Sequence, residues 1–270
     1  MARITEIVIR PVHLATLAAF LAAACAGVPG TAPTPMPATA STVDFGKAGH
    51  GTTPVIAPFS TAEPDTLPPA WKPYRLTRFK KLTEYRLVPL DGTVALKATA
   101  DASASGLQHD VVADPREYPW LSWRWMVPAL NEAANNTLAE VEDSPARIVV
   151  AFEGGRDKLP PAEQINYDLG LAIAGNEMPY ATIMYIWENN LPEGAIITHH
   201  FSTRVKMIVA ASGRKKLGLW HEERMNLLED YRRAFGEEPP HVKSVGLMSD
   251  SDNTGAHTTA YYGDISFQRR

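Results

Sequence analysis

Short runs of alternating apolar and polar residues dominate the chain from about residue 85 onward. Leu121, Trp123, Trp125 and Val127 fall on one face of such a run, and residues 182–188 alternate in the same way. Successive side chains of a strand point to opposite faces, so this pattern predicts half-buried strands. We expect strands at residues 85–90, 93–100, 121–127, 147–153, 182–188, 204–210, 242–249 and 258–267.

Turn and helix signals separate these strands. Asp91 and Gly92 form a two-residue pair typical of a type I′ hairpin turn. A helical stripe runs from Leu227 to Phe235 and is ended by Gly236, and a weaker helical pattern covers residues 162–173. Many strands with one or two short inserted helices predict a mainly β fold, a β-sandwich of the jelly-roll type. A doubly wound α/β fold would need a helix between most strands.

The first 25 residues predict export. Arg3 and Arg10 provide a positively charged start, and an apolar run over residues 12–24 leads to Cys25. This order is typical of a signal peptide, and the run is shorter than the about 20 residues of a membrane span. We therefore expect residues 1–25 to be a signal peptide that directs export and ends at Cys25.

Cys25 is the sole cysteine of the chain and stands where a lipobox cysteine would stand, after three alanines. Its thiol would then carry a lipid that anchors the protein to a bilayer. Leu21 lies four residues before the cysteine rather than the usual three, so cleavage after Ala24 or Ala26 into a soluble periplasmic protein stays open. No disulfide can form within the chain in either case.

Composition divides the remainder into two parts. Residues 26–56 are rich in Pro, Ala and Thr and predict a disordered tether, whereas residues 57–270 predict a single β-sandwich domain. The chain has 26 basic and 30 acidic residues and a net charge of −4. Nucleic-acid binding needs a basic surface, so we do not expect a nucleic-acid partner.

A combination of short segments runs through this domain: Ser105–Leu107, Leu121–Trp125, Asp143–Arg147, Tyr185–Trp187, Asp230–Tyr231, Phe235–Glu237, Asp250–Thr254 and Tyr262–Asp264. Together they resemble the bacterial family catalogued as domain of unknown function 3047. The resemblance covers nearly all of residues 57–268. It implies an exported β-sandwich protein, and it implies no catalytic residues because the family has no established activity.

The segment that begins at Asp250 matches the start of a calcium loop. Asp250, Asp252 and Thr254 offer oxygens at alternate positions, but Tyr261 stands where an EF-hand needs glutamate. A calcium site at these three residues stays open, and no other cofactor is expected. The default interpretation is a turn in which Asp250, Asp252 and Asn253 accept backbone N–H groups.

Two histidine segments are poor zinc candidates. His221 and Glu222 begin like the His-Glu-x-x-His motif, but Met225 holds the place of the second histidine. His199 and His200 are adjacent, so on a strand they would point to opposite faces and make a poor chelate.

Five residues form the expected ligand face: Arg124, Arg147, Trp187, Tyr262 and Asp264. Aromatic planes stack on sugars, and a charge on an interior strand must be paired or face a cleft. Two alternatives stay open. Trp187 is also suited to the core, and each of the two arginines could form a structural ion pair.

These observations favour a non-catalytic protein of the cell envelope that binds a carbohydrate or another envelope component. One alternative is a glycan hydrolase or lyase on the same sandwich, with Glu153 and Glu188 as its carboxylates. Another is a structural partner in an envelope complex. The expected partners are the bilayer, through Cys25, and a glycan or envelope protein.

Overall fold

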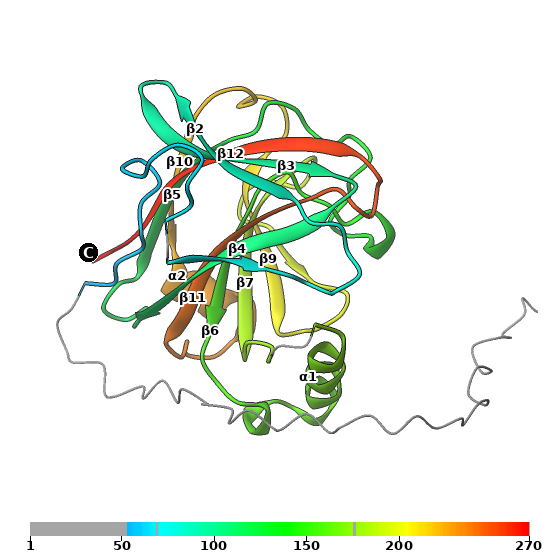
Figure 1. The fold of residues 1–270 in the computed structure, drawn as a ribbon. Helices are drawn as coiled ribbons and strands as arrows, with labels where there is room; N and C mark the ends of the chain where they lie inside the picture. The colour runs from blue at the N-terminus through cyan, green and yellow to red at the C-terminus, as the bar shows by residue number, and fades with distance from the viewer. Residues whose placement is uncertain (1–52, 69, 175–176, 270) are drawn as a thin grey trace, which may run out of the picture. The chain divides into compact units, whose positions relative to one another are not determined.

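The structure is a computed structural model, and it describes residues 53–68, 70–174 and 177–269 (Figure 1). The predicted signal peptide, the lipidation site Cys25 and residues 26–52 of the predicted tether lie outside the described residues. Ile56, the last residue of that tether, is buried, and Phe59 is fully buried. The packed domain therefore includes the end of the segment whose composition suggests a tether.

Two β-sheets form the framework of the described part of the chain. The strands are β1 (Trp71–Tyr74), β2 (Glu84–Leu90), β3 (Thr93–Asp101), β4 (Ala104–Ala113), β5 (Trp120–Met126), β6 (Arg147–Phe152), β7 (Ala181–Glu188), β8 (Ile196–Thr198), β9 (Val205–Ser212), β10 (His221–Asn226), β11 (Val242–Asp250) and β12 (His257–Gln268). The seven-stranded sheet has the order β1-β4-β11-β6-β7-β9-β8, and the five-stranded sheet has the order β10-β5-β12-β3-β2. Neighbouring strands are antiparallel, except that β7 and β9 are parallel.

The core lies between the two sheets. Trp123 and Trp125 of β5 reach across to Tyr185 and Trp187 of β7, with ring centroids 5.2 and 5.9 Å apart. All four side chains are buried. This packing of two mainly antiparallel sheets on a shared aromatic core confirms the predicted mainly β sandwich.

Two α-helices are inserted, α1 (Pro161–Ala174) and α2 (Leu227–Phe235), with short 3₁₀ turns at Ala139–Val141 and Arg156–Lys158. In α2, Tyr231 packs on Phe152 at the end of β6, with ring centroids 4.6 Å apart. Helix α2 is capped at its start by Asn226, whose side chain accepts the Glu229 N–H, and at its end by Gly236 with φ 72°. No helix among the described residues has both the length and the apolar character needed to cross a membrane.

The predicted elements correspond closely to β2, β3, β5, β6, β7, β9, β11 and β12 and to both helices. Asp91 and Gly92 have φ values of 50° and 77°, as a type I′ turn requires. Strands β1, β4, β8 and β10 were not predicted from the sequence. In β4, Ser105 and His109 occupy buried positions, so the apolar alternation is broken.

Candidate functional site

A groove of about 450 Å³ lies on the five-stranded sheet, where β5, β10 and β12 run side by side. Strand β5 sends Leu121, Trp123 and Trp125 into the core, and the intervening Ser122 and Arg124 therefore face outward. Strand β10 pairs with β5 and β12 pairs with its other side. The outward-facing side chains of these three strands that line the groove are Ser122, Arg124, Glu222, Arg224, Ser266 and Gln268.

Two indole rings beside the groove are each covered by a guanidinium group. The Arg224 Cζ lies 3.8 Å from the centroid of the Trp120 ring, and the Arg124 Cζ lies 4.6 Å from the centroid of the Trp220 ring. These are favourable cation–π contacts that hold the arginine side chains along the sheet. The indole Nε1 of Trp220 donates to Asp91 at 2.9 Å, which fixes the second ring.

Arg124 and Glu222 face each other across β5 and β10. Among the described residues, neither side chain has a hydrogen bond or an ion pair, although Arg224 donates to Gln268 at 3.1 Å. The Arg124 side chain lies over Gly263, where an added Cβ would collide with it. The groove therefore contains a strong donor group and a strong acceptor group that the protein itself leaves available.

Asp264 lines the same groove, but its oxygens are engaged. The carboxylate accepts the Phe59 N–H at 2.7 Å and the Ser60 N–H at 3.0 Å, and it also bonds the Ser60 hydroxyl. Asp264 thus holds residues 59–60 against β12. Of the expected ligand face, the structure brings only Arg124 and Asp264 to the groove.

Glu223 pairs with Trp123 of β5, so its side chain lies on the face of the sheet that packs against the core. Burial raises the pKa of Glu223 to about 7, and the nearby charge of Lys216 offsets part of this effect. The His221 Nε2 lies 3.0 Å from the Glu223 carboxylate. The groove is therefore bordered by a carboxyl group that is protonated over much of the acidic range.

The other three residues of the expected ligand face are buried, and this part of the prediction is wrong. Trp187 and Tyr262 are fully buried, and Arg147 is 1% exposed. The Tyr262 hydroxyl donates to the Met248 carbonyl at 2.7 Å, and the Trp187 indole bonds the Gly213 carbonyl at 3.3 Å. None of the three can contact a ligand, because the tight packing of the core encloses them.

Arg147 instead forms a buried ion-pair network, the structural alternative that the sequence left open. Its Nε and Nη2 donate to Asp250 at 2.8 and 3.0 Å, and its Nη1 donates to Glu142 at 3.1 Å. Burial raises the pKa of Asp250 to about 6, although the Arg147 charge opposes this shift, and the charge of Asp143 adds to it. The network connects β6 and β11 to the loop before β6.

The turn after β11 is capped by Asp143 rather than by the residues of the turn itself. Asp143 accepts the backbone N–H groups of Asn253 and Thr254, at 3.3 and 2.8 Å, and the Thr254 hydroxyl at 2.6 Å. Asp250 accepts a backbone N–H, as expected, but this group belongs to Ser144 rather than to the turn. Within the described residues, Asp252 pairs with Lys80 and the Asn253 side chain donates to the Ala139 carbonyl, so the expected capping by these two residues is wrong. The capping oxygens come from another loop, which a local pattern cannot reveal.

Asp252 is paired with Lys80 at 2.7 Å. One carboxylate oxygen from each of Asp143, Asp250 and Asp252 lies within 4.8 Å of the others. The guanidinium of Arg147 and the ammonium of Lys80 supply positive charge at the place where the sequence suggests calcium.

The two candidate catalytic carboxylates are far apart. Glu153 follows the end of β6, which lies beside Ala181 at the start of β7, whereas Glu188 ends β7. Seven to eight residues of strand separate them, or about 25 Å at 3.3 Å per residue. Glycosidases need two carboxylates within about 10 Å, so this pair is wrong. Glu188 instead accepts the N–H groups of Asn190 and Leu191.

Strand β10 supplies two groove residues that the sequence analysis missed as such, Glu222 and Arg224. Its segment begins like an incomplete zinc motif. It has few apolar residues because β10 is an edge strand. The available signal was that the charged residues Glu222 and Arg224 alternate with His221 and Met225. This alternation places Glu222 and Arg224 in the groove only when β10 pairs with β5.

Comparisons with known proteins identify the family of the chain. A family model described as "Protein of unknown function (DUF3047)" matches residues 69–266. The sequence has no match among curated proteins. One solved structure with similarity is titled "Cellulose induced protein, Cip1", with 10% sequence identity and a TM-score of 0.31 over 73% of this chain and 90% of that one. A similarity of that degree does not indicate what this chain binds.

Proposed function

We propose that this chain, which belongs to the DUF3047 family of proteins of unknown function, binds a carbohydrate in the groove on its five-stranded sheet. The observation that carries the proposal is the facing pair Arg124 and Glu222, which have no hydrogen bond or ion pair among the described residues and lie beside two indole rings. Binding, rather than chemistry on the sugar, is the function we assign to the groove.

A sugar offers pairs of hydroxyl groups and flat C–H surfaces. The Arg124 guanidinium can donate to two hydroxyls at once, and the Glu222 carboxylate can accept from others. The parts of the Trp120 and Trp220 rings that the two guanidinium groups leave uncovered offer apolar surface next to these groups. A site with a few convergent polar groups and aromatic walls is the common design for small polar ligands.

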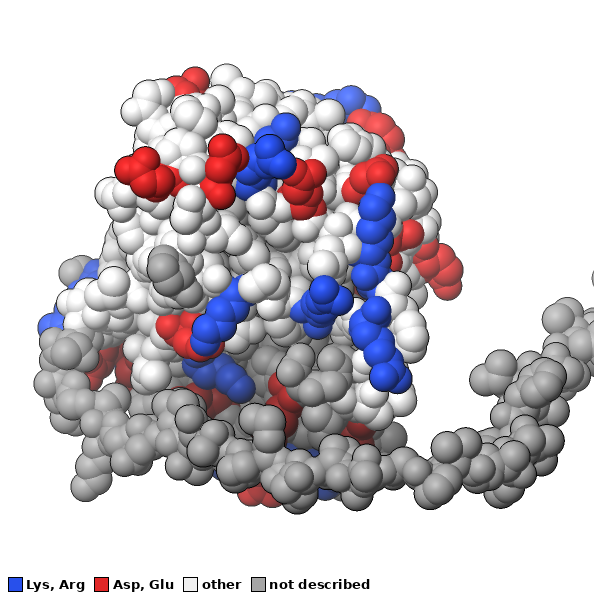
Figure 2. Space-filling view, in the orientation of Figure 1, with Lys and Arg blue, Asp and Glu red and all other residues white. Residues whose placement is uncertain are grey.

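The charge of the groove favours a neutral ligand. Arg124 and Arg224 are balanced by Glu222 and Asp264, so no single sign dominates. Lysine and arginine side chains are likewise mixed with acidic ones on the face of the molecule in Figure 2. Together with the net charge of −4, this mixture supports the expectation that nucleic acid is not the partner.

The alternative of a hydrolase or lyase receives less support. Glu222 and Glu223 are adjacent on β10 and therefore point to opposite faces of the sheet. Asp264 is already bonded to residues 59–60. The groove thus lacks two free carboxylates on opposite sides of one ligand, which glycoside hydrolysis requires.

One feature supports the second alternative, a structural partner in an envelope complex. Ile165, Leu169 and Ile173 form a row along α1 and are 68%, 48% and 37% exposed. Replacing Leu169 with Glu would disturb a partner protein bound there without affecting the groove. Replacing Arg124 would affect only the groove, so the two substitutions separate the two functions.

The test is a glycan-array screen of the purified chain, followed by titration of each bound glycan by calorimetry. Arg124→Met keeps much of the side-chain volume but removes the donors, and we expect it to weaken binding by about 10- to 100-fold, or about 1.4–2.7 kcal/mol. Arg86→Met is the matched control, because Arg86 lies on β2 of the same sheet and pairs with Glu84 in solvent. A screen without binding, or equal affinities for the wild type and Arg124→Met, would contradict the proposal.

A further inference from the structure

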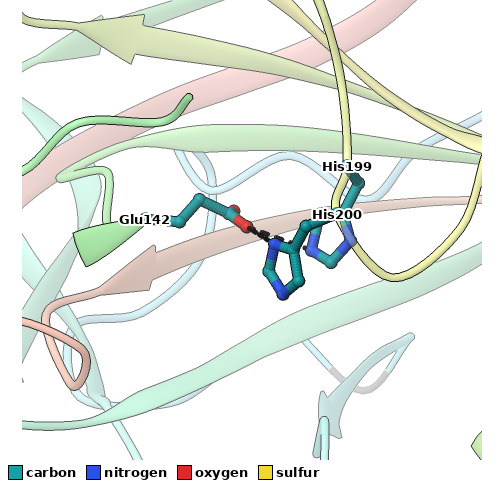
Figure 3. Close-up of side chains that lie close together, drawn as sticks. All are labelled: Glu142, His199 and His200. Carbon is teal, nitrogen blue, oxygen red and sulfur yellow. Dashed lines mark ion pairs between the residues drawn. The ribbon is translucent and has the colours of Figure 1, made fainter. Parts of the chain in front are cut away.

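Three side chains from two loops converge near the start of β6, where Arg147 contacts Glu142 (Figure 3). Glu142 directly follows the 3₁₀ turn Ala139–Val141, and His199 and His200 lie in the loop between β8 and β9. The His199 Nε2 is 3.2 Å and the His200 Nδ1 is 3.1 Å from the same oxygen, Oε2 of Glu142. The two imidazole rings stack with centroids 4.3 Å apart.

This convergence corrects the sequence interpretation of the two histidines. Adjacent residues point to opposite faces only if they continue a strand, and β8 ends at Thr198. In the loop, the His199 Nδ1 accepts the Phe201 N–H at 3.1 Å, and both rings turn toward Glu142. The pair is therefore able to chelate.

The three ligand atoms have the spacing of a coordination sphere. Zinc binds histidine nitrogen and carboxylate oxygen at about 2.0–2.2 Å, so neighbouring ligand atoms lie about 2.8–3.6 Å apart, with the lower values in octahedral and the upper values in tetrahedral geometry. The two measured separations from Oε2 fall in that range. All three atoms lie within 4.8 Å of one another.

The carboxylate is held in place from its other side. Glu142 is buried, and its Oε1 accepts a hydrogen bond from Arg147 Nη1 at 3.1 Å, while Arg147 itself is held by Asp250. Oε2 is left to face the histidines. Carboxylates that bind metals are commonly oriented in this way by a hydrogen bond to the second oxygen.

Charge provides a second and independent reason. Glu142, Asp143 and Asp250 are all buried, and the buried cation Arg147 contacts two of them, Glu142 and Asp250. Three carboxylates and one guanidinium leave two negative charges in excess in this part of the described structure. Buried charges are normally paired, and a divalent cation would supply the two positive charges that balance this excess.

We propose that Glu142 Oε2, His199 Nε2 and His200 Nδ1 bind a divalent transition metal ion of the zinc class. Imidazole nitrogen is a ligand for Zn²⁺, Cu²⁺ or Ni²⁺, whereas Ca²⁺ prefers six to eight oxygens. His200 is half exposed, so solvent reaches the site and can complete the coordination. The site is separate from the groove, and neither proposal depends on the other.

Metal binding requires one local adjustment. The Phe201 N–H points at His199 Nδ1, so the free protein carries the ring proton on Nε2. When the metal takes Nε2, the proton moves to Nδ1, and the Phe201 N–H has to turn away from it. One neutral hydrogen bond is a small loss compared with three metal–ligand bonds.

The experiment uses the untagged chain after removal of metals with EDTA. Zn²⁺ is titrated by calorimetry and Co²⁺ by visible absorption, with Ca²⁺ as a competitor. We expect one Zn²⁺ per chain, no competition by Ca²⁺, and d–d bands that report nitrogen and oxygen ligands. His200→Ala should weaken Zn²⁺ binding at least about 100-fold, beyond the about 10- to 100-fold loss caused by removing a residue that only orients a ligand.

His257→Ala is the matched control, because His257 also lies beside a carboxylate, Asp101 at 3.9 Å, on the exposed surface. It should bind Zn²⁺ like the wild type. His200 is half exposed, so its variant should fold, and a thermal melt checks this. Three results would overturn the proposal: no zinc binding by the wild type, equal binding by the variant His199→Ala/His200→Ala, or displacement of Zn²⁺ by Ca²⁺.

Discussion

Replacing Glu223 with Gln should stabilise the protein at neutral and alkaline pH. The Glu223 side chain is only 10% exposed, and burial raises its pKa from 4.5 to about 7. The folded state therefore holds this proton more tightly than the unfolded state. The contribution of Glu223 to stability is therefore fully present below pH 4.5, is lost as the pH rises through the range 4.5–7, and is absent above it.

The size of the effect follows from the shift. A rise in pKa from 4.5 to about 7 corresponds to about 3 kcal/mol, and partial contact with solvent reduces this to about 2–3 kcal/mol. Glutamine has the same shape but no charge, so Glu223→Gln avoids the loss. The gain at pH 8 should raise the melting temperature by roughly 4–10 °C, and the gain at pH 4.5 should be near zero.

The assay is urea unfolding of the wild type and Glu223→Gln at several pH values between 4.5 and 8. Lys216, Glu193 and His221 also lie near Glu223, and they are unchanged in the comparison. Glu222→Gln is the control, because this neighbour faces solvent and should change stability by less than about 0.5 kcal/mol at every pH. The reasoning fails if Glu223→Gln shows the same stability difference at pH 4.5 and pH 8.

Three further predictions can be tested with single substitutions. Trp187→Ala should lower the free energy of unfolding by about 3–5 kcal/mol, measured by urea unfolding, because the side chain is fully buried; a small loss would mean that the core relaxes around it. Asp143→Ala should cost about 1–3 kcal/mol, because the N–H groups of Asn253 and Thr254 lose their acceptor; an unchanged melting temperature would show that water replaces it. Cys25→Ala should move the protein from the membrane to the soluble fraction of cells, and two soluble proteins would refute the predicted lipid anchor.

Local patterns were enough to predict most elements of the fold. Alternation in the segment of β5 depends only on which residues are apolar, and burial of one face makes that pattern necessary. The turn at Asp91 and Gly92 is likewise determined by residues that tolerate positive φ. The family resemblance and the mainly β class also followed from the sequence.

The tertiary structure decided which of these elements meet. Arg147 and Asp250 are 103 residues apart, and their bond makes the arginine structural rather than a ligand contact. The groove requires β10 beside β5 in one particular register, which brings Glu222 opposite Arg124. Glu142 meets His199 and His200 only because two loops fold toward each other. Pairing across such distances depends on the packing of the whole core, and no local pattern of apolar and polar residues contains it.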